Sequence, residues 1–107
     1  MSDSHWIDAM AADDLPADDV IGLELAGHDI AIYSVGDQLY ATENVCTHGQ
    51  ARLSDGFLEG HEIECPLHQG RFDVRSGQPM CEPVTQPIRV YATKIEDGRE
   101  WIDLGAA

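Results

Sequence analysis

Two short motifs with the same ligand types constrain this 107-residue chain more than any other feature. The first is Cys46-Thr47-His48, and the second, after sixteen intervening residues, is Cys65-Pro66-Leu67-His68. Two thiolates and two imidazoles suit either one tetrahedral zinc ion or a two-iron, two-sulfide cluster with cysteine on one iron and histidine on the other. The motifs therefore predict a metal site made by two loops, and both metals are open at this point.

The mixed composition of each motif favours the cluster over zinc. Structural zinc motifs usually pair like ligands, whereas each motif here contains one cysteine and one histidine. In an extended loop tip, nearby side chains point in different directions, so Cys46 and His48 can reach two different metal atoms, as can Cys65 and His68. We therefore expect these four residues to hold two irons, with a reduction potential above that of an all-cysteine cluster.

The rest of the chain is typical of an all-β protein. Short runs rich in β-branched and aromatic residues alternate with glycine, aspartate and proline turns, and strands are expected at 6–10, 20–25, 29–34, 38–42, 62–64, 88–95 and 100–104. No segment longer than about ten residues has the apolar spacing of an amphipathic helix. The pattern predicts one domain over residues 1–107, a small barrel or sandwich, with the turn-rich segment from about 44 to 83 inserted as a metal-binding lobe.

Charge and cysteine usage limit the partners and the compartment. Six basic against twenty acidic residues give a formal net charge of −14, which argues against nucleic acid as a partner. The acidic excess either keeps a small monomer soluble or steers it to a basic docking surface. Three cysteines do not make a disulfide scaffold, and no signal peptide or membrane-spanning apolar run is present, so we expect a cytoplasmic, soluble protein without membrane contact.

The two motifs with their flanking residues, Cys46-Thr47-His48-Gly49 and Cys65-Pro66-Leu67-His68-Gln69-Gly70, resemble the two boxes of Rieske proteins. Segments 40–42, 51–60, 70–74 and 81–86 are also similar to the soluble Rieske ferredoxins of bacterial aromatic ring-hydroxylating dioxygenase systems, those for naphthalene in particular. The resemblance covers about residues 6 to 104. It implies a Rieske fold and one Rieske-type 2Fe-2S cluster.

In function, the resemblance implies an electron carrier and not an enzyme. Such a carrier takes single electrons from a flavin-dependent ferredoxin reductase and passes them to the Rieske centre of a terminal oxygenase. Two alternatives stand beside it. The chain could serve another oxygenase, such as a salicylate hydroxylase, or belong to a different class as a zinc-held interaction module or a small reductase subunit.

Departures from the wider family predict a low potential. Respiratory Rieske proteins carry a further cysteine in each box, joined as a disulfide, and a serine that bonds a bridging sulfide, whereas this chain has Ala51, Leu67 and Gly70 where those residues would fall. Without such bonds the reduced state is less stabilised, so the potential should lie near the low end of the Rieske range, about −150 mV. The remaining Cys81 is expected to be a packed or partly exposed thiol and not a ligand.

Overall fold

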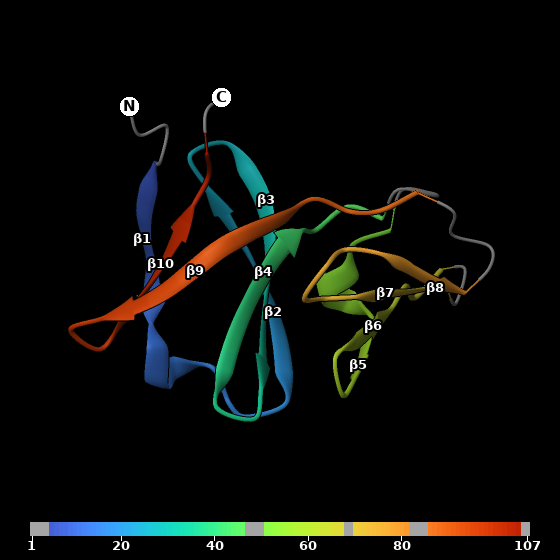
Figure 1. The fold of residues 1–107 in the computed structure, drawn as a ribbon, viewed down its shortest axis with the longest axis horizontal. Coiled ribbons are helices and arrows are strands. Elements are labelled where there is room, and N and C mark those ends of the chain that lie inside the picture. The colour runs from blue at the N-terminus through green and yellow to red at the C-terminus, as the bar shows by residue number, and fades with distance from the viewer. Residues whose placement is uncertain (1–4, 47–50, 68–69, 82–85, 106–107) are drawn as a thin grey trace.

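The computed structural model describes residues 5–46, 51–67, 70–81 and 86–105, and these residues form two antiparallel sheets (Figure 1). The larger sheet has six strands in the order β1-β10-β9-β4-β3-β2. Its members are β1 (Trp6–Ala11), β2 (Asp19–Leu25), β3 (His28–Val35), β4 (Gln38–Glu43), β9 (Val90–Glu96) and β10 (Arg99–Asp103). The sheet curls so that Cα atoms of its edge strands β1 and β2 come within 8 Å of each other.

The smaller sheet lies between β4 and β9 in the chain. It has four strands in the order β5-β6-β7-β8, formed by β5 (Phe57–Glu59), β6 (Glu62–Glu64), β7 (Arg71–Asp73) and β8 (Pro79–Cys81). Because β4 and β9 pair directly with each other in the larger sheet, the smaller sheet is an insertion between neighbouring strands. In Figure 1 it stands beside the larger sheet as a separate group of short arrows.

Residues with positive φ form the tight turns at which two of the hairpins reverse direction. The β2–β3 hairpin turns at Ala26 and Gly27, with φ of 51° and 83°, and the β9–β10 hairpin turns at Asp97 and Gly98, with φ of 55° and 76°. Positive φ at both central positions suits the right-handed twist of the flanking strands. The all-β expectation is confirmed.

The start of β9 differs from the prediction, because the strand begins at Val90 and not at residue 88. Ile88 instead donates its backbone N–H to the carbonyl of Gly77 at 2.9 Å, and Arg89 accepts one hydrogen bond from the N–H of Glu43. The chain here connects the two sheets before it joins the ladder. Two short 3₁₀ turns, η1 (Ala12–Asp14) and η2 (Leu53–Asp55), were also not predicted.

Strand β3 separates two apolar cores. Ile30 and Ile32 pack with Tyr91 and Ile102 inside the curled sheet, and the alternate residues Ala31 and Tyr33 pack toward the inserted sheet. Successive side chains of a strand point to opposite faces, so a continuous apolar run marks a strand that is buried on both sides. Strand β3 therefore lies between the two cores, and the inserted sheet packs against one of its faces.

Helical structure among the described residues is limited to the two 3₁₀ turns, and none of their helices has the length and apolar character needed to cross a membrane.

Candidate metal centre

The two predicted motifs begin at equivalent points of two hairpins. Cys46 donates its backbone N–H to the carbonyl of Ala51 at 2.9 Å, and Cys65 donates to the carbonyl of Gly70 at 2.8 Å. One residue farther out, Val45 pairs with Arg52 and Glu64 pairs with Arg71, so both hairpins also share the same register. Each loop therefore opens at a cysteine and closes five residues later.

Both cysteine side chains reach the same apolar core. Cys46 is 2% exposed and Cys65 is fully buried, and both belong to the cluster that contains Leu53, Ile63 and Phe72. Two sulfur ligands from different hairpins, enclosed together in apolar surroundings, fit a thiolate-bound metal group that is shielded from water. The described part of the predicted ligand set is therefore compatible with one shared site.

The other two predicted ligands, His48 and His68, lie outside the described residues. By sequence they fall inside the two loops that close at Ala51 and Gly70. Their assignment as ligands stays a prediction.

A buried asparagine stands two residues before Cys46. Asn44 is fully buried, and its side-chain amide donates to a carboxylate oxygen of Asp29 at 3.0 Å and to the hydroxyl of Ser54 at 2.9 Å. Its side-chain oxygen accepts the backbone N–H of Ser54 at 2.7 Å. Sequence reasoning missed these three residues, because single polar residues at this spacing match no known ligand or capping pattern.

A salt bridge extends the same network to the surface. Arg52 donates through Nε and Nη2 to the two carboxylate oxygens of Asp29, at 3.1 and 3.0 Å. The hydrogen bond from Arg52 is the main reason that the pKa of Asp29 lies below its ordinary value, with a smaller lowering from Asn44. The aspartate is thus held ionised at the base of the first loop.

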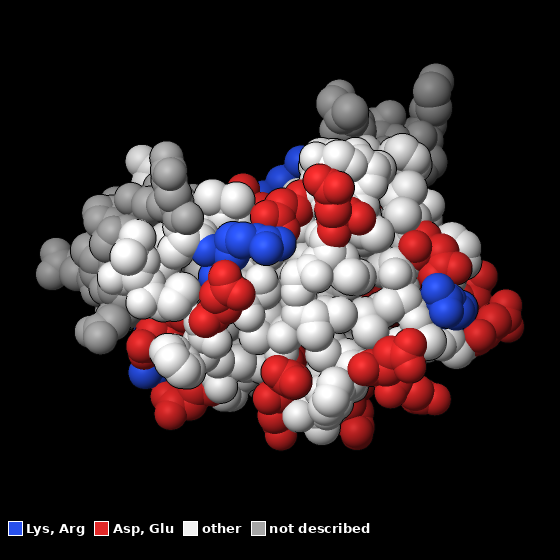
Figure 2. Space-filling view, turned by 180° about the vertical axis from the view of Figure 1, so that it is seen from behind, with Lys and Arg blue, Asp and Glu red and all other residues white. Residues whose placement is uncertain are grey.

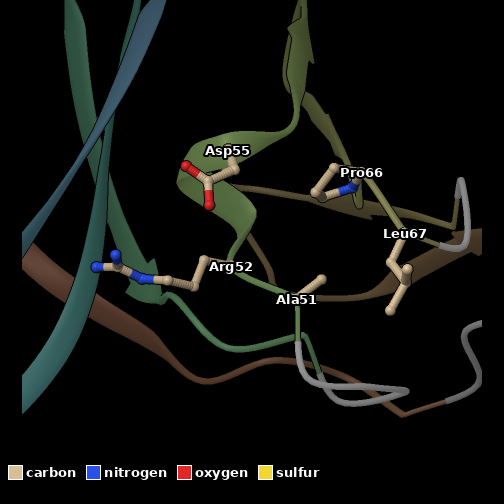
Figure 3. Close-up of a pocket in the computed structure, with 5 residues that line it drawn as sticks. All are labelled: Ala51, Arg52, Asp55, Pro66 and Leu67. Atoms are coloured by element: carbon tan, nitrogen blue, oxygen red, sulfur yellow. The ribbon is translucent and has the colours of Figure 1, made fainter.

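A shallow pocket of about 330 Å³ lies between the two loops. Pro66 and Leu67 line it from the second loop, and Ala51, Arg52 and Asp55 line it from the end of the first loop and η2 (Figure 3). Leu67 is 62% exposed. An exposed leucine beside the two cysteine-bearing hairpins makes Leu67 a candidate for the docking rim, the surface around the site that would contact a partner protein.

Two further residues of the inserted segment can be placed, Cys81 and His61. Cys81 ends β8 and is exposed, whereas Cys46 and Cys65 are buried. His61, in the turn between β5 and β6, is half-buried, because its ring packs edge-on against Tyr40 with centroids 5.7 Å apart. That contact joins the inserted sheet to β4.

Acidic side chains dominate the surface, and the few basic ones are already engaged. Figure 2 shows Asp and Glu spread over the visible face, with Lys and Arg in small groups beside them. Arg71 alone lies within 4 Å of three glutamates, Glu59, Glu62 and Glu64. The net negative charge therefore remains available to a basic surface.

Comparison with known proteins identifies the site. Residues 5–92 match the family model of the Rieske [2Fe-2S] domain. The chain is 59% identical over 99 residues to the ferredoxin component of the naphthalene 1,2-dioxygenase system of Pseudomonas aeruginosa, covering 92% of this chain and 95% of the relative. It is 58% identical over 95 residues to the ferredoxin component of the naphthalene 1,2-dioxygenase/salicylate 5-hydroxylase systems of a Ralstonia species, covering 89% and 91%.

The fold comparison agrees. A ferredoxin–oxygenase complex of carbazole 1,9a-dioxygenase contains a chain that superposes with a TM-score of 0.89 at 39% identity, covering 95% of both chains. The confirmed fold is thus an all-β Rieske fold, and the group that fits the two buried cysteines is one Rieske 2Fe-2S cluster in preference to zinc. The chain belongs to the Rieske [2Fe-2S] domain family.

Proposed function

We propose that this protein is the ferredoxin of a bacterial aromatic ring-hydroxylating dioxygenase system. It would carry one electron at a time from a flavin-dependent ferredoxin reductase to the Rieske centre of a terminal oxygenase. The observation that carries the proposal is the 59% identity, over nearly the whole chain, to a ferredoxin component of the naphthalene 1,2-dioxygenase system. A related fold seen in complex with an oxygenase supports the acceptor half of this role.

Four residues are proposed to hold the cluster. Cys46 and Cys65 would supply the thiolates from the buried end of the two hairpins, and His48 and His68 would supply the imidazoles from the loops. The bound cluster supplies one-electron redox chemistry. The chain itself encloses the two sulfur ligands in an apolar core and keeps bulk water away from them.

A second oxygenase class is also supported. The Ralstonia relative is named for both naphthalene dioxygenase and salicylate 5-hydroxylase systems. One ferredoxin that serves both a dioxygenase and a salicylate hydroxylase is therefore a specific second candidate. Because a carrier does not touch the aromatic substrate, the acceptor enzyme decides between the two.

The molecular setting is proposed on physical grounds. Strand β3 packs one face in the core of the curled sheet and the other face in the core under the inserted sheet. This shared strand supports a single domain over residues 1–107 with a cluster lobe at about 44–83. Two thiol ligands need a reducing compartment, which supports a cytoplasmic location. The acidic surface supports a monomer that meets its partners by electrostatic attraction.

The proposal is tested first on the cluster and then on the partners. The purified protein should contain two irons and two sulfides, and should show a Rieske-type paramagnetic resonance signal after reduction. Cys46→Ser and Cys65→Ser should abolish that signal, and Cys81→Ser, which changes an exposed cysteine, should preserve it. A colourless protein with one zinc ion would contradict the cluster assignment. A midpoint potential well above zero would contradict the predicted low potential.

Reconstitution separates the two acceptor classes. The protein is combined with a flavin-dependent reductase and, in separate reactions, with a naphthalene-type dioxygenase or a salicylate hydroxylase. Product formation that depends on the ferredoxin identifies the acceptor. If the intact cluster protein is reduced by the reductase but supports neither oxygenase, the proposed role is wrong.

A further inference from the structure

The hairpin that carries Cys46 and the hairpin that carries Cys65 differ in the hydrogen bonds that hold the two chain segments at the base of each loop, here called the stem, together. The second hairpin extends the ladder between β6 and β7, which has three residue pairs, Glu62↔Asp73, Ile63↔Phe72 and Glu64↔Arg71. The stem of the first hairpin has one isolated bridge, Val45↔Arg52, outside any named strand. Ladder pairs hold the second cysteine in place, so the first needs another support.

Asn44 supplies that support with both its backbone and its side chain. Its N–H donates to the carbonyl of Asp29 at 2.9 Å, and its carbonyl accepts the N–H of Leu53 at 2.7 Å. The side chain adds the bonds to Asp29 and Ser54, so one residue connects the end of β4, the turn η2 and β3. A buried amide with this many partners has one favourable orientation, because each lost bond would leave a polar group unsatisfied.

The network is closed from the remaining side by β2. A Cβ atom added to Gly22 would lie 2.7 Å from the hydroxyl oxygen of Ser54 and 2.8 Å from the side-chain nitrogen of Asn44. Neither distance is compatible with van der Waals contact, so the space above the amide is already filled. Asn44 cannot shift toward β2, and Asp29, held by Arg52, limits movement on the side of β3.

We propose that Asn44 is a positioning residue for the first metal-binding loop, and that through Asp29 and Ser54 it fixes the direction in which Cys46 enters the site. This inference rests on the proposed role of Cys46 as a ligand. Its consequence is that losing the Asn44 side chain alters the metal centre more than it alters the stability of the β-sheets. Residues that orient ligands typically affect metal retention 10- to 100-fold.

The first test compares Asn44→Ala and the milder Ser54→Ala with a matched control. Thr93→Val removes one side-chain hydrogen bond within the same six-stranded sheet, from Thr93 of β9 to the carbonyl of Leu39, at the end of β4 opposite to the end that leads into the loop. For each variant the iron-release rate with a chelator, the reduction potential, the paramagnetic resonance signal and the urea midpoint are measured. We expect about tenfold faster iron release and a shifted potential for the Asn44 and Ser54 variants, and wild-type values of both for Thr93→Val.

An exchange of the two polar groups tests the geometry directly. Asn44→Asp alone places two carboxylates against each other at positions 44 and 29, and should release iron fastest. Adding Asp29→Asn restores one amide donor facing one carboxylate, and should recover most of the iron retention and the wild-type signal. Gly22→Ala, which presses on the same amide from β2, should resemble Asn44→Ala.

The outcomes separate this inference from the assignment of the ligand. If Cys46→Ser keeps the cluster, the site itself is wrong. If Cys46→Ser loses the cluster, but the Asn44 and Ser54 variants have wild-type potential, signal and iron release, only the positioning role is wrong. The positioning role is also overturned if these variants change iron release no more than Thr93→Val at an equal loss of urea stability, or if the double exchange restores nothing.

Discussion

Glu100 lies inside the curled sheet without a polar partner. The residue is fully buried on β10, and no described residue forms a hydrogen bond with either carboxylate oxygen. Its cross-strand neighbours on the same face are Met10 of β1 and Ile95 of β9. Burial without compensation raises the pKa of Glu100 from its ordinary value of 4.5 to about 7.

The charged groups of the flanking strands do not face this carboxyl. Asp8 and Lys94 are opposite Trp101, and Glu96 is opposite Arg99. Neighbours of Glu100 in the strand point to the other face of the sheet, so these three charges also lie on that face. Desolvation is therefore the cause of the raised pKa, and the folded protein holds Glu100 in its neutral form below about pH 7.

The sign of the effect on stability follows from proton binding. Between about pH 4.5 and pH 7 the folded state keeps the proton and the unfolded state loses it, so the free energy of unfolding falls as pH rises. A pKa difference of about 2.5 at 1.36 kcal/mol per unit gives about 3 kcal/mol of stability, present at the acidic end and lost once the pH passes the folded pKa.

Substitution isolates this contribution. Glu100→Leu should unfold at a higher urea concentration than the wild type near pH 8, by an amount equivalent to about 3 kcal/mol, and the difference should shrink as the pH falls toward about 5.5. Glu24→Gln removes an exposed carboxylate from the same sheet and serves as the control. Urea midpoints of the holoprotein are compared at each pH, so that effects common to all variants cancel. A Glu100→Leu difference that is constant across this range would refute the assignment of a neutral buried carboxyl.

Three further predictions concern docking and the turns. Leu67→Glu should slow electron transfer to the oxygenase about tenfold without changing the visible spectrum, whereas Ile95→Glu, at a similarly exposed residue of β9, should leave the transfer rate unchanged. Equal transfer rates for both variants in stopped-flow kinetics would remove Leu67 from the docking rim. Transfer should also slow as salt rises from about 0.05 to 0.5 M, and rates that ignore ionic strength would exclude steering by the acidic surface. Gly77→Ala should lower the free energy of unfolding by about 2 to 3 kcal/mol, because Gly77 has φ of 79° and a Cβ would collide with the carbonyl of Ile88. Gly36→Ala, with φ of 59° and open space, should cost about 1 kcal/mol, and equal losses in thermal or urea unfolding would contradict the collision.

The strands of the larger sheet could be predicted because local chemistry determines them, whereas the three-residue strands β5, β7 and β8 of the smaller sheet were not predicted. The apolar run from Ile30 to Tyr33 and the turns at Ala26-Gly27 and Asp97-Gly98 mark strands whose ends are set within a few residues of the signal. The start predicted for β9, at residue 88, was wrong for a non-local reason. Ile88 donates its backbone N–H to the carbonyl of Gly77, eleven residues earlier. A hydrogen bond over this distance in the chain does not affect the apolar periodicity around residue 88.

The ligand motifs could also be read directly, because metal chemistry restricts the residue types that bind iron. The residues that support them could not. Asn44 and Ser54 are common loop residues, and their importance comes from a fold that brings Asp29 and Gly22 against them. Glu100 differs from them, because alternation places it on the same core-facing side of β10 as Ile102, and only its residue type suggests a solvent-facing side chain.

Strand β3 connects these observations, because it carries both cores and the anchor of the first loop. Its residue Asp29 holds Asn44, Ala31 and Tyr33 pack in the cluster that contains Cys46 and Cys65, and Ile32 packs in the core of the curled sheet. Strand β3 is therefore common to the base of the first loop and to both apolar cores.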